Sequence, residues 1–312
     1  MIIDIFPHLI SDRVIKFVQE KKEIKFKIPS ENEDLDSRLN LMDKYGVDIH
    51  ALSPTTPILL GLSAEDAATV CRMSNDDNYA FCRARPDRFV NVCMISLLDV
   101  KSAMTEVERA VNELDCRGIT ISSNQDGKGL DSEEYYPFYE MVAEKDLPIL
   151  IHPTDWESYP LVDSAEGWLM MLIFGWPFDT TQAVWRLIFG GVFDHFPSLK
   201  IVMHHLGAMF PFFAGRMETA AHLMEKLPRP FEEYWANIYG DTAVSRTPSA
   251  VPCGYEFFGA DRMVYASDYP FGAEKGEAFI RDNLNAARAL DIPDQEMKKI
   301  LCDNAKKLLK IE

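Results

Sequence analysis

Short apolar runs recur along the chain and alternate with amphipathic stretches of helical period. Each apolar run has the length of a buried strand, and several end at a proline, histidine or aspartate. The runs predict strands at residues 2–6, 50–53, 89–95, 118–122, 148–151, 199–203, 235–239 and 263–266. The amphipathic stretches predict helices at residues 35–45, 64–85, 100–114, 134–144, 180–190, 210–224, 277–290 and 294–309.

Strands that alternate with helices are typical of a parallel sheet with helical crossovers. The pattern predicts an α/β fold, a (β/α)8 TIM barrel with a helical insertion after strand 5 at residues 155–178. A doubly wound open sheet is the alternative, but no Gly-rich phosphate loop follows the first strand. We expect residues 1–312 to form one barrel domain, with an irregular surface excursion at 16–36.

Polar residues that can bind metals or transfer protons follow several of the predicted strands. The C-terminal ends of barrel strands meet in one bowl. This rule gathers His8, Asn124, His152, His205, Asp241 and Asp268. Two imidazoles and a carboxylate suit zinc or another divalent cation, and three protein ligands leave positions for water or substrate. The alternatives are a core histidine at 152, a surface turn at His8 and a turn-capping Asp268.

Other residues near the bowl admit two interpretations each. His204 and His205 are adjacent, so strand geometry points them to opposite sides, and we expect only one to face the bowl. Arg216 is either an exposed cation or a clamp for a substrate carboxylate. Aromatic side chains of the expected insertion either form a wall over the metal or pack in the interior. These residues are Trp156, Trp176 and Phe178.

The composition excludes several classes of partner. Lys plus Arg is 32 and Asp plus Glu is 49, so the net charge of −17 repels nucleic acid and anionic membranes. The six cysteines form no CxxC pair, as in reduced cytosolic proteins. We expect a cytoplasmic protein without a signal peptide or membrane span. The most apolar stretch, residues 168–178, is too short to span a bilayer and is interpreted as a pocket wall or an interface.

Six motifs, in this order and spread over nearly the whole chain, resemble the amidohydrolase-2 family. The resemblance is to the branch that contains aminocarboxymuconate semialdehyde decarboxylase and the resorcylate-type decarboxylases. The motifs are Ile-Asp-Ile-Phe-Pro-His at 3–8, Met-Asp-Lys-Tyr-Gly-Val-Asp at 42–48, Arg-Pro-Asp-Arg-Phe at 85–89, Ile-Leu-Ile-His-Pro at 149–153, His-Leu-Gly-Ala-Met-Phe-Pro-Phe at 205–212 and Ala-Ser-Asp-Tyr-Pro-Phe-Gly at 266–272.

The resemblance implies a barrel that holds one divalent metal ion, Zn²⁺ or alternatively Mn²⁺. It implies metal ligands at His8, His152 and Asp268, and an acid/base or substrate-orienting role for His205, with His204 an extra histidine one position earlier. Arg216 matches an arginine that, in some members, binds a substrate carboxylate across a dimer interface. A homodimer is therefore expected.

One departure from the family pattern concerns the metal. The first histidine of the family's His-x-His is Phe6 here, and a phenyl ring cannot ligate a metal. The metal is then held by His8, His152, Asp268 and water, or it recruits another carboxylate, or it is lost. Asp4 shares the face of Phe6 but lies roughly 6 to 7 Å deeper, so we favour the first alternative.

The resulting hypotheses are a decarboxylase, a hydrolase and a metal-free protein. The first is a metal-dependent, non-oxidative carboxy-lyase of an aromatic or conjugated carboxylic acid, in which Asp268 or His205 protonates the carbon that carries the carboxylate. That donor needs a raised pKa. The second is a hydrolase or hydratase with Asp268 as base, and the third is a metal-free variant. The substrate-binding candidates are Arg216, Asn124, Trp156 and Trp176.

Overall fold

The computed structural model describes residues 1–22, 29, 32–154, 167–224, 227–244 and 247–312. Eight parallel strands form one sheet in the order β1-β2-β3-β4-β7-β8-β9-β10. The strands are β1 Ile3–Asp4, β2 Ile49–Leu52, β3 Phe89–Met94, β4 Cys116–Ser122, β7 Pro148–His152, β8 Lys200–Met203, β9 Ile238–Asp241 and β10 Met263–Val264. Beyond β10, the Tyr265 carbonyl accepts a bond of 3.0 Å from the Ile5 N–H, which brings the two edges together. The predicted (β/α)8 TIM barrel is confirmed.

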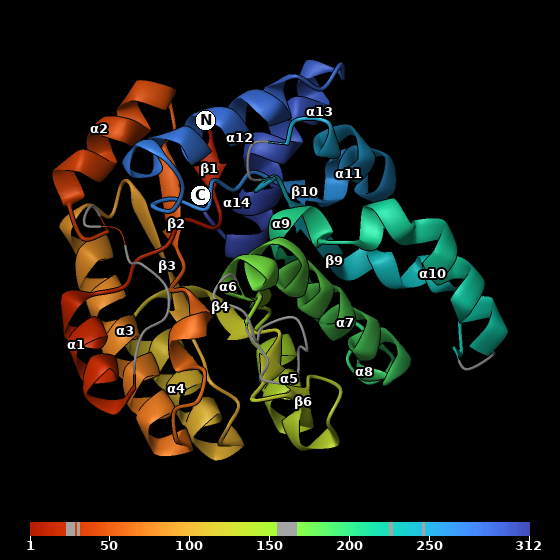
Figure 1. The fold of residues 1–312 in the computed structure, drawn as a ribbon, viewed down its shortest axis with the longest axis horizontal. Helices are drawn as coiled ribbons and strands as arrows, with labels where there is room; N and C mark the ends of the chain where they lie inside the picture. The colour runs from red at the N-terminus through yellow and green to blue at the C-terminus, as the bar shows by residue number, and fades with distance from the viewer. Residues whose placement is uncertain (23–28, 30–31, 155–166, 225–226, 245–246) are drawn as a thin grey trace.

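Helices surround the strands (Figure 1). They are α1 Asp12–Lys21, α2 Leu35–Tyr45, α3 Ala64–Ala84, α4 Val100–Glu113, α5 Tyr136–Glu144, α6 Gly167–Met170, α7 Trp176–Phe189, α8 Val192–His195, α9 His204–Gly207, α10 Phe210–Met224, α11 Ala250–Phe258, α12 Glu277–Arg288, α13 Asp294–Lys298 and α14 Asn304–Leu309. A small antiparallel hairpin, β5 Asn124–Gln125 with β6 Lys128–Gly129, follows β4. α10 extends away from the barrel at the right of the view.

The alternation of side chains along the strands builds two apolar layers. In β7, Leu150 belongs to the barrel interior, whereas Ile149 and Ile151 belong to the outer layer beneath the helices. The interior cluster contains Ile5, Phe6, Ala51, Val92, Leu150, Val202, Tyr239, Ala243, Val264, Ala266, Leu308 and Leu309. Phe6 is therefore a core residue at the end of the barrel where the strands finish.

Two elements differ from their predictions near the N-terminus and before β9. Helix α1 overlaps the start of the excursion expected at 16–36. It forms because Ser11 caps it and because Val14 and Val18 make a narrow buried stripe, which the surrounding charges obscured. Residues 231–237 form a 3-10 helix, so the strand predicted at 235–239 begins only at Ile238. Trp235 is buried there among aromatic rings, which explains why the run resembles a strand.

Two further helical features were not predicted. Helix α11 contains Pro252 and Gly254, which resemble helix breakers in the sequence. A Cβ on Gly254 would lie 2.7 Å from Cγ of Leu206, so close packing requires glycine at this position. The closing helix predicted at 294–309 is divided by a π-helical turn at Lys299–Asp303.

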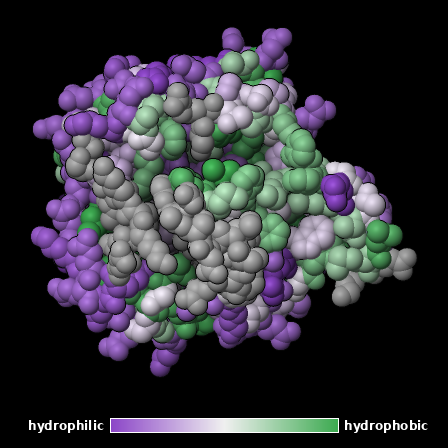
Figure 2. Space-filling view, viewed as in Figure 1, coloured by the Kyte–Doolittle hydropathy of each residue, from purple (hydrophilic) through white to green (hydrophobic). Residues whose placement is uncertain are grey.

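The segment after β7 carries exposed apolar side chains. Residues 155–166, including Trp156, lie outside the described part, and α6, a π-helical turn at Met171–Gly175 and α7 follow. Figure 2 shows hydrophobic side chains gathered over the region of α6, α7 and α10. The large exposed ones are Leu169, Leu172, Ile173, Phe174, Phe178, Phe212, Leu223 and Met224. Within the described ranges, none of the helices has both the length and the hydropathy needed to cross a bilayer.

A buried polar network ties β1 to the segment after β10. The Asp4 carboxylate accepts N–H bonds from Ser267 at 3.0 Å and Phe6 at 3.3 Å. Its other oxygen lies 3.6 Å from Nε2 of His50. Burial raises the pKa of Asp4 from 3.8 to about 7, although the bonds from Ser267 oppose the shift. Burial, followed by the nearby Arg38 charge, lowers the pKa of His50 well below its usual value.

We predict that Asp4→Asn removes a pH dependence of stability. The pKa of Asp4 is higher in the folded state than in the unfolded state, so its contribution is full below about pH 4 and is lost as the pH rises through 7. At about 1.4 kcal/mol per pKa unit, the variant should gain about 2 to 3 kcal/mol on the parent between pH 5 and pH 8. Urea unfolding of both proteins at pH 5 and pH 8, in the presence of a chelator, measures their free energies of unfolding. The prediction is wrong if the difference between variant and parent is the same at the two pH values.

We also predict that Gly240→Ala destabilises the barrel. A Cβ at this position of β9 would lie 2.8 Å from Cδ2 of Phe258, so the ring or the strand must shift. Overpacking of this kind costs about 1 to 3 kcal/mol in urea unfolding. Gly215→Ala on α10 is the control, because a Cβ there meets nothing within 4 Å and alanine favours helix by about 0.5 to 1 kcal/mol. Equal effects of the two substitutions would contradict the packing argument.

Candidate active site

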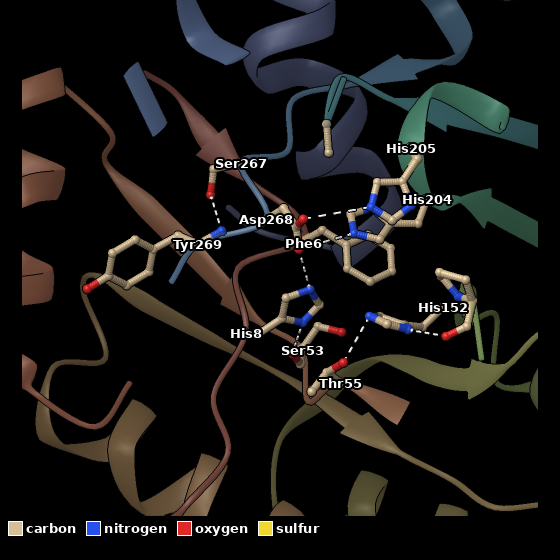
Figure 3. A network of polar contacts seen from close by, with 12 residues as sticks. Phe6, His8, Ser53, Thr55, His152, His204, His205, Ser267, Asp268 and Tyr269 are labelled. Atoms are coloured by element: carbon tan, nitrogen blue, oxygen red, sulfur yellow. Dashed lines mark hydrogen bonds and ion pairs between the residues drawn. The ribbon is translucent and has the colours of Figure 1, made fainter. Parts of the chain in front are cut away.

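Histidines and an aspartate from three parts of the chain converge at the C-terminal ends of the strands (Figure 3). His8 follows β1, His204 and His205 follow β8, and Asp268 follows β10. One carboxylate oxygen of Asp268 lies 3.1 Å from Nε2 of His8 and 3.6 Å from Nε2 of His204. The other lies 3.7 Å from Nε2 of His205. Asp268 is therefore the centre of the cluster.

The backbone after β8 turns sharply and brings both adjacent histidines to the bowl. Met203 is extended, but His205 and Leu206 have φ of 55° and 58°. The rings of His204 and His205 consequently lie side by side, with centroids 3.8 Å apart. The prediction that only one would face the bowl is wrong, because strand geometry ends at Met203. Asp268 also has a positive φ, of 66°.

Three of the imidazoles are oriented by an oxygen at Nδ1. His8 contacts the Ser53 carbonyl at 2.8 Å, His152 contacts the Pro153 carbonyl at 2.6 Å, and His204 contacts the Asp241 carboxylate. In a neutral imidazole whose Nδ1 donates its proton in this way, Nε2 carries the lone pair. Ligating histidines are held by this kind of contact in metal proteins.

The donor set fits a divalent cation. Two groups of three side chains each place one possible ligand atom per residue within 4.8 Å of the others. The first group is His8, His152 and His204, and the second is His204, His205 and Asp268. Nε2 of His204 is buried and has no hydrogen-bond partner among the described residues. An orphaned buried nitrogen that faces other imidazoles and a carboxylate is the arrangement that zinc or manganese would satisfy.

The electrostatics keep Asp268 ionised. Burial would raise the pKa of Asp268, but the neighbouring imidazoles of His204, His205 and His8 lower it well below its usual value. This differs from the expectation that a donor at this position has a raised pKa. Burial would also lower the pKa of His204, but Asp241 and then Asp268 raise it to about 9. Burial lowers the pKa of His152 and of His205.

Exposure defines the side from which a ligand can approach. The side chains of His8 and His204 are fully buried, whereas those of His205 and Asp268 are 19% and 15% exposed. Trp176 borders His152 with centroids 6.1 Å apart, and Phe271 borders His8 at 5.7 Å. A flat ligand would therefore meet aromatic edges and the exposed His205 and Asp268.

Phe6 packs against the cluster without separating its ligand atoms. Its ring is fully buried and stacks on His204, with centroids 4.0 Å apart and an interplanar angle of 13°. It lies 5.7 Å from the His8 ring and 6.1 Å from the His152 ring. Phe6, which replaces the first histidine of the family pattern, thus lies directly under the site.

The other predicted substrate-binding residues either contact residues outside the histidine cluster or lie outside the described part of the chain. The Asn124 amide donates to Asp179 at 3.0 Å, and its oxygen accepts the Gly127 N–H at 2.8 Å. Arg216 is exposed on α10, and its guanidinium lies 5.9 Å from the Phe213 ring. Trp156 falls outside the described residues. The substrate-binding roles of Asn124, Trp156 and Arg216 stay predictions.

Three supporting contacts were missed from the sequence. The Thr55 hydroxyl lies 3.0 Å from Nε2 of His152, and Arg38 donates to the His8 carbonyl at 2.7 Å. Asp241, which was expected in the bowl, instead supports His204 from behind. Its position at a strand end was a signal for this role, whereas Thr55 lies beyond Pro54, where the predicted strand stopped.

Comparisons with known proteins agree with this geometry. A family model described as Amidohydrolase matches residues 27–311. The chain is 31% identical over 245 residues to the 2-amino-3-carboxymuconate-6-semialdehyde decarboxylase of Dictyostelium discoideum, covering 76% of this chain and 67% of that one. It is 28% identical over 301 residues to the gamma-resorcylate decarboxylase of Rhizobium sp., covering 89% and 87%.

A solved structure adds a bound metal. The 5-carboxyvanillate decarboxylase of Novosphingobium aromaticivorans, a mutant with bound manganese and 3-methoxy-4-hydroxy-5-nitrobenzoic acid, superposes with a TM-score of 0.87. The match covers 100% of this chain and 97% of that one, at 25% identity. The family model and these relatives confirm the resemblance carried by the motifs. The chain belongs to the amidohydrolase-2 family, and the relatives described above are decarboxylases.

Proposed function

We propose that the protein is a metal-dependent, non-oxidative decarboxylase of an aromatic or conjugated carboxylic acid. The observation that carries the proposal is the convergence of buried imidazoles on Asp268, beside a partly exposed His205. Family membership and the names of the relatives support the same reaction class. The aromatic borders of the site at Trp176 and Phe271 suit a flat substrate.

The residues that would hold the metal are His8, His152 and Asp268, as the family pattern implies. Their Nε2 atoms and carboxylate are fixed by neighbouring oxygens and nitrogens, so little reorganisation is needed on binding. A bound Zn²⁺ or Mn²⁺ would supply a positive charge that orients the substrate oxygens and stabilises negative charge. The manganese in the carboxyvanillate enzyme supports a divalent ion, and zinc is our proposal for this chain.

The protein's own groups would move one proton in the reaction. The pair formed by Nε2 of His205 and Asp268 is 3.7 Å apart and reaches the exposed side of the bowl. The lowered pKa values of both groups leave the resting pair without an acidic proton. We propose that the pair takes one proton from solvent when the substrate binds and delivers it to the ring carbon that carries the carboxylate. The new C–H bond forms, and the electron pair of the broken C–C bond returns to the ring as carbon dioxide leaves. Each turnover therefore consumes one proton.

We also propose a homodimer and a cellular location. The exposed apolar side chains of α6, α7 and α10 suit a homodimer interface. Arg216 on α10 would then reach a substrate carboxylate in the partner's bowl, as the family resemblance implies. We further propose one barrel domain over residues 1–312 and a cytoplasmic location, in keeping with the reduced cysteines.

We predict that Asp268→Asn and His205→Ala each lower carbon dioxide release by at least about 100-fold, because each removes half of the proton-delivering pair. The assay measures carbon dioxide from a panel of hydroxybenzoic acids with added Zn²⁺ or Mn²⁺. His195→Ala is the control, because His195 is an exposed histidine on α8. Circular dichroism checks that all three variants fold.

Three outcomes would contradict the proposal. Parental rates in Asp268→Asn or His205→Ala would refute the roles of these residues. Opening of lactones without carbon dioxide release would indicate a hydrolase instead. Activity that survives complete removal of metal would indicate the metal-free variant.

A further inference from the structure

We infer that His204 is a metal ligand in this chain and supplies the imidazole that Phe6 cannot. The inference deepens the proposed function and rests on it only in that a divalent metal occupies the bowl. It concerns which side chains hold that metal, and it adds His204 to His8, His152 and Asp268.

The first support is that the side chains of Phe6 and His204 are in direct contact. Phe6 follows β1 and His204 follows β8, and two other strands, β9 and β10, lie between these two strands in the barrel. Their rings nevertheless stack at 4.0 Å and 13° (Figure 3). His204 therefore reaches across the bowl to lie over the ring at position 6. One flat apolar ring serves as the floor, and the imidazole above it supplies the nitrogen.

The second support is the way in which His204 is held. Its Nδ1 contacts the Asp241 carboxylate, and that carboxylate also accepts the N–H groups of Leu206 at 3.1 Å and Ala243 at 2.9 Å. Both side chains of the pair are fully buried. Such a carboxylate fixes the ring and directs Nε2 away from itself, which is how oriented ligands are built in metal sites.

The third support is the position of Nε2. This atom is buried, lacks a hydrogen-bond partner in the described part of the chain, and lies 3.6 Å from an Asp268 oxygen. His204 also belongs to both groups of side chains that could hold an ion, once with His8 and His152 and once with His205 and Asp268. His204 is the only member common to these two groups of described residues. A cation bound by His8, His152 and Asp268 would therefore lie next to it.

His205 is the matched comparison for His204. The two residues are neighbours in the chain, their rings are 3.8 Å apart, and both approach Asp268. His205 is partly exposed and is not in the group with His8 and His152. We therefore assign metal binding to His204 and leave His205 to the substrate.

The test is metal affinity, measured on the full chain stripped with chelator and titrated with Zn²⁺, Mn²⁺ or Co²⁺. Calorimetry gives the dissociation constant, elemental analysis gives the metal content, and the visible spectrum of Co²⁺ reports its ligands. We expect His204→Ala to weaken binding at least 100-fold and to change the Co²⁺ spectrum. His205→Ala should stay within about threefold of the parent. Asp241→Asn should weaken binding about 10- to 100-fold, as for other groups that orient ligands.

A double variant that moves the imidazole from position 204 back to position 6 tests whether His204 replaces the missing ligand. Phe6→His combined with His204→Ala should recover metal affinity to within about tenfold of the parent, because the imidazole returns from β1. His204→Gln, which keeps a polar side chain of similar length, replaces His204→Ala if the alanine variant does not fold in the chelated state.

Each alternative result identifies what has failed. Parental metal affinity in the His204 variants overturns the inference and leaves the metal-dependent function in place. Equal losses of metal affinity in His204→Ala and His205→Ala also overturn it, because the loss would then not be specific to His204. A parent chain that binds none of the three metals overturns both the inference and the metal dependence of the proposed function.

Discussion

The Asp268 carboxylate is the interaction on which the rest of the site depends. It gathers imidazoles from the ends of β1 and β8, at distances of 3.1 to 3.7 Å from their Nε2 atoms. A buried carboxylate is costly unless positive charge or hydrogen bonds compensate it. Here the surrounding imidazoles lower the pKa of Asp268 despite its burial. The same environment suits a divalent cation, which would replace part of this compensation.

The barrel supports this concentration of polar groups in two ways. The interior layer, with Phe6 as its last aromatic ring, forms an apolar floor under the histidines. The backbone at His205, Leu206 and Asp268 adopts positive φ, which costs about 1 kcal/mol or more per residue outside glycine. Such conformations persist because the packed elements around them determine the chain path. At this site they direct two consecutive histidines into one bowl.

The sequence predicted the scaffold better than the details of the site. Apolar runs followed by His8, His152 and Asp268 were sufficient to place these residues in one bowl, since parallel strands finish on the same side. The sequence could not show that the chain leaves strand geometry at Met203, so the orientation of His204 was missed. It also gave no sign of the contact between Phe6 and His204, because no local pattern links residues that far apart. The end of the 3-10 helix, residues 235–237, was mistaken for the start of a strand because buried aromatic residues suit both.

The proposed function requires a metal ion in the bowl although Phe6 removes one family ligand. Anomalous diffraction at the absorption edge of zinc or manganese, from crystals grown with that metal, would locate the ion. We expect one peak per chain, bounded by Nε2 of His8, His152 and His204 and by the carboxylate of Asp268. Absence of a peak there, with metal supplied and the four side chains ordered, would refute a metal at this site.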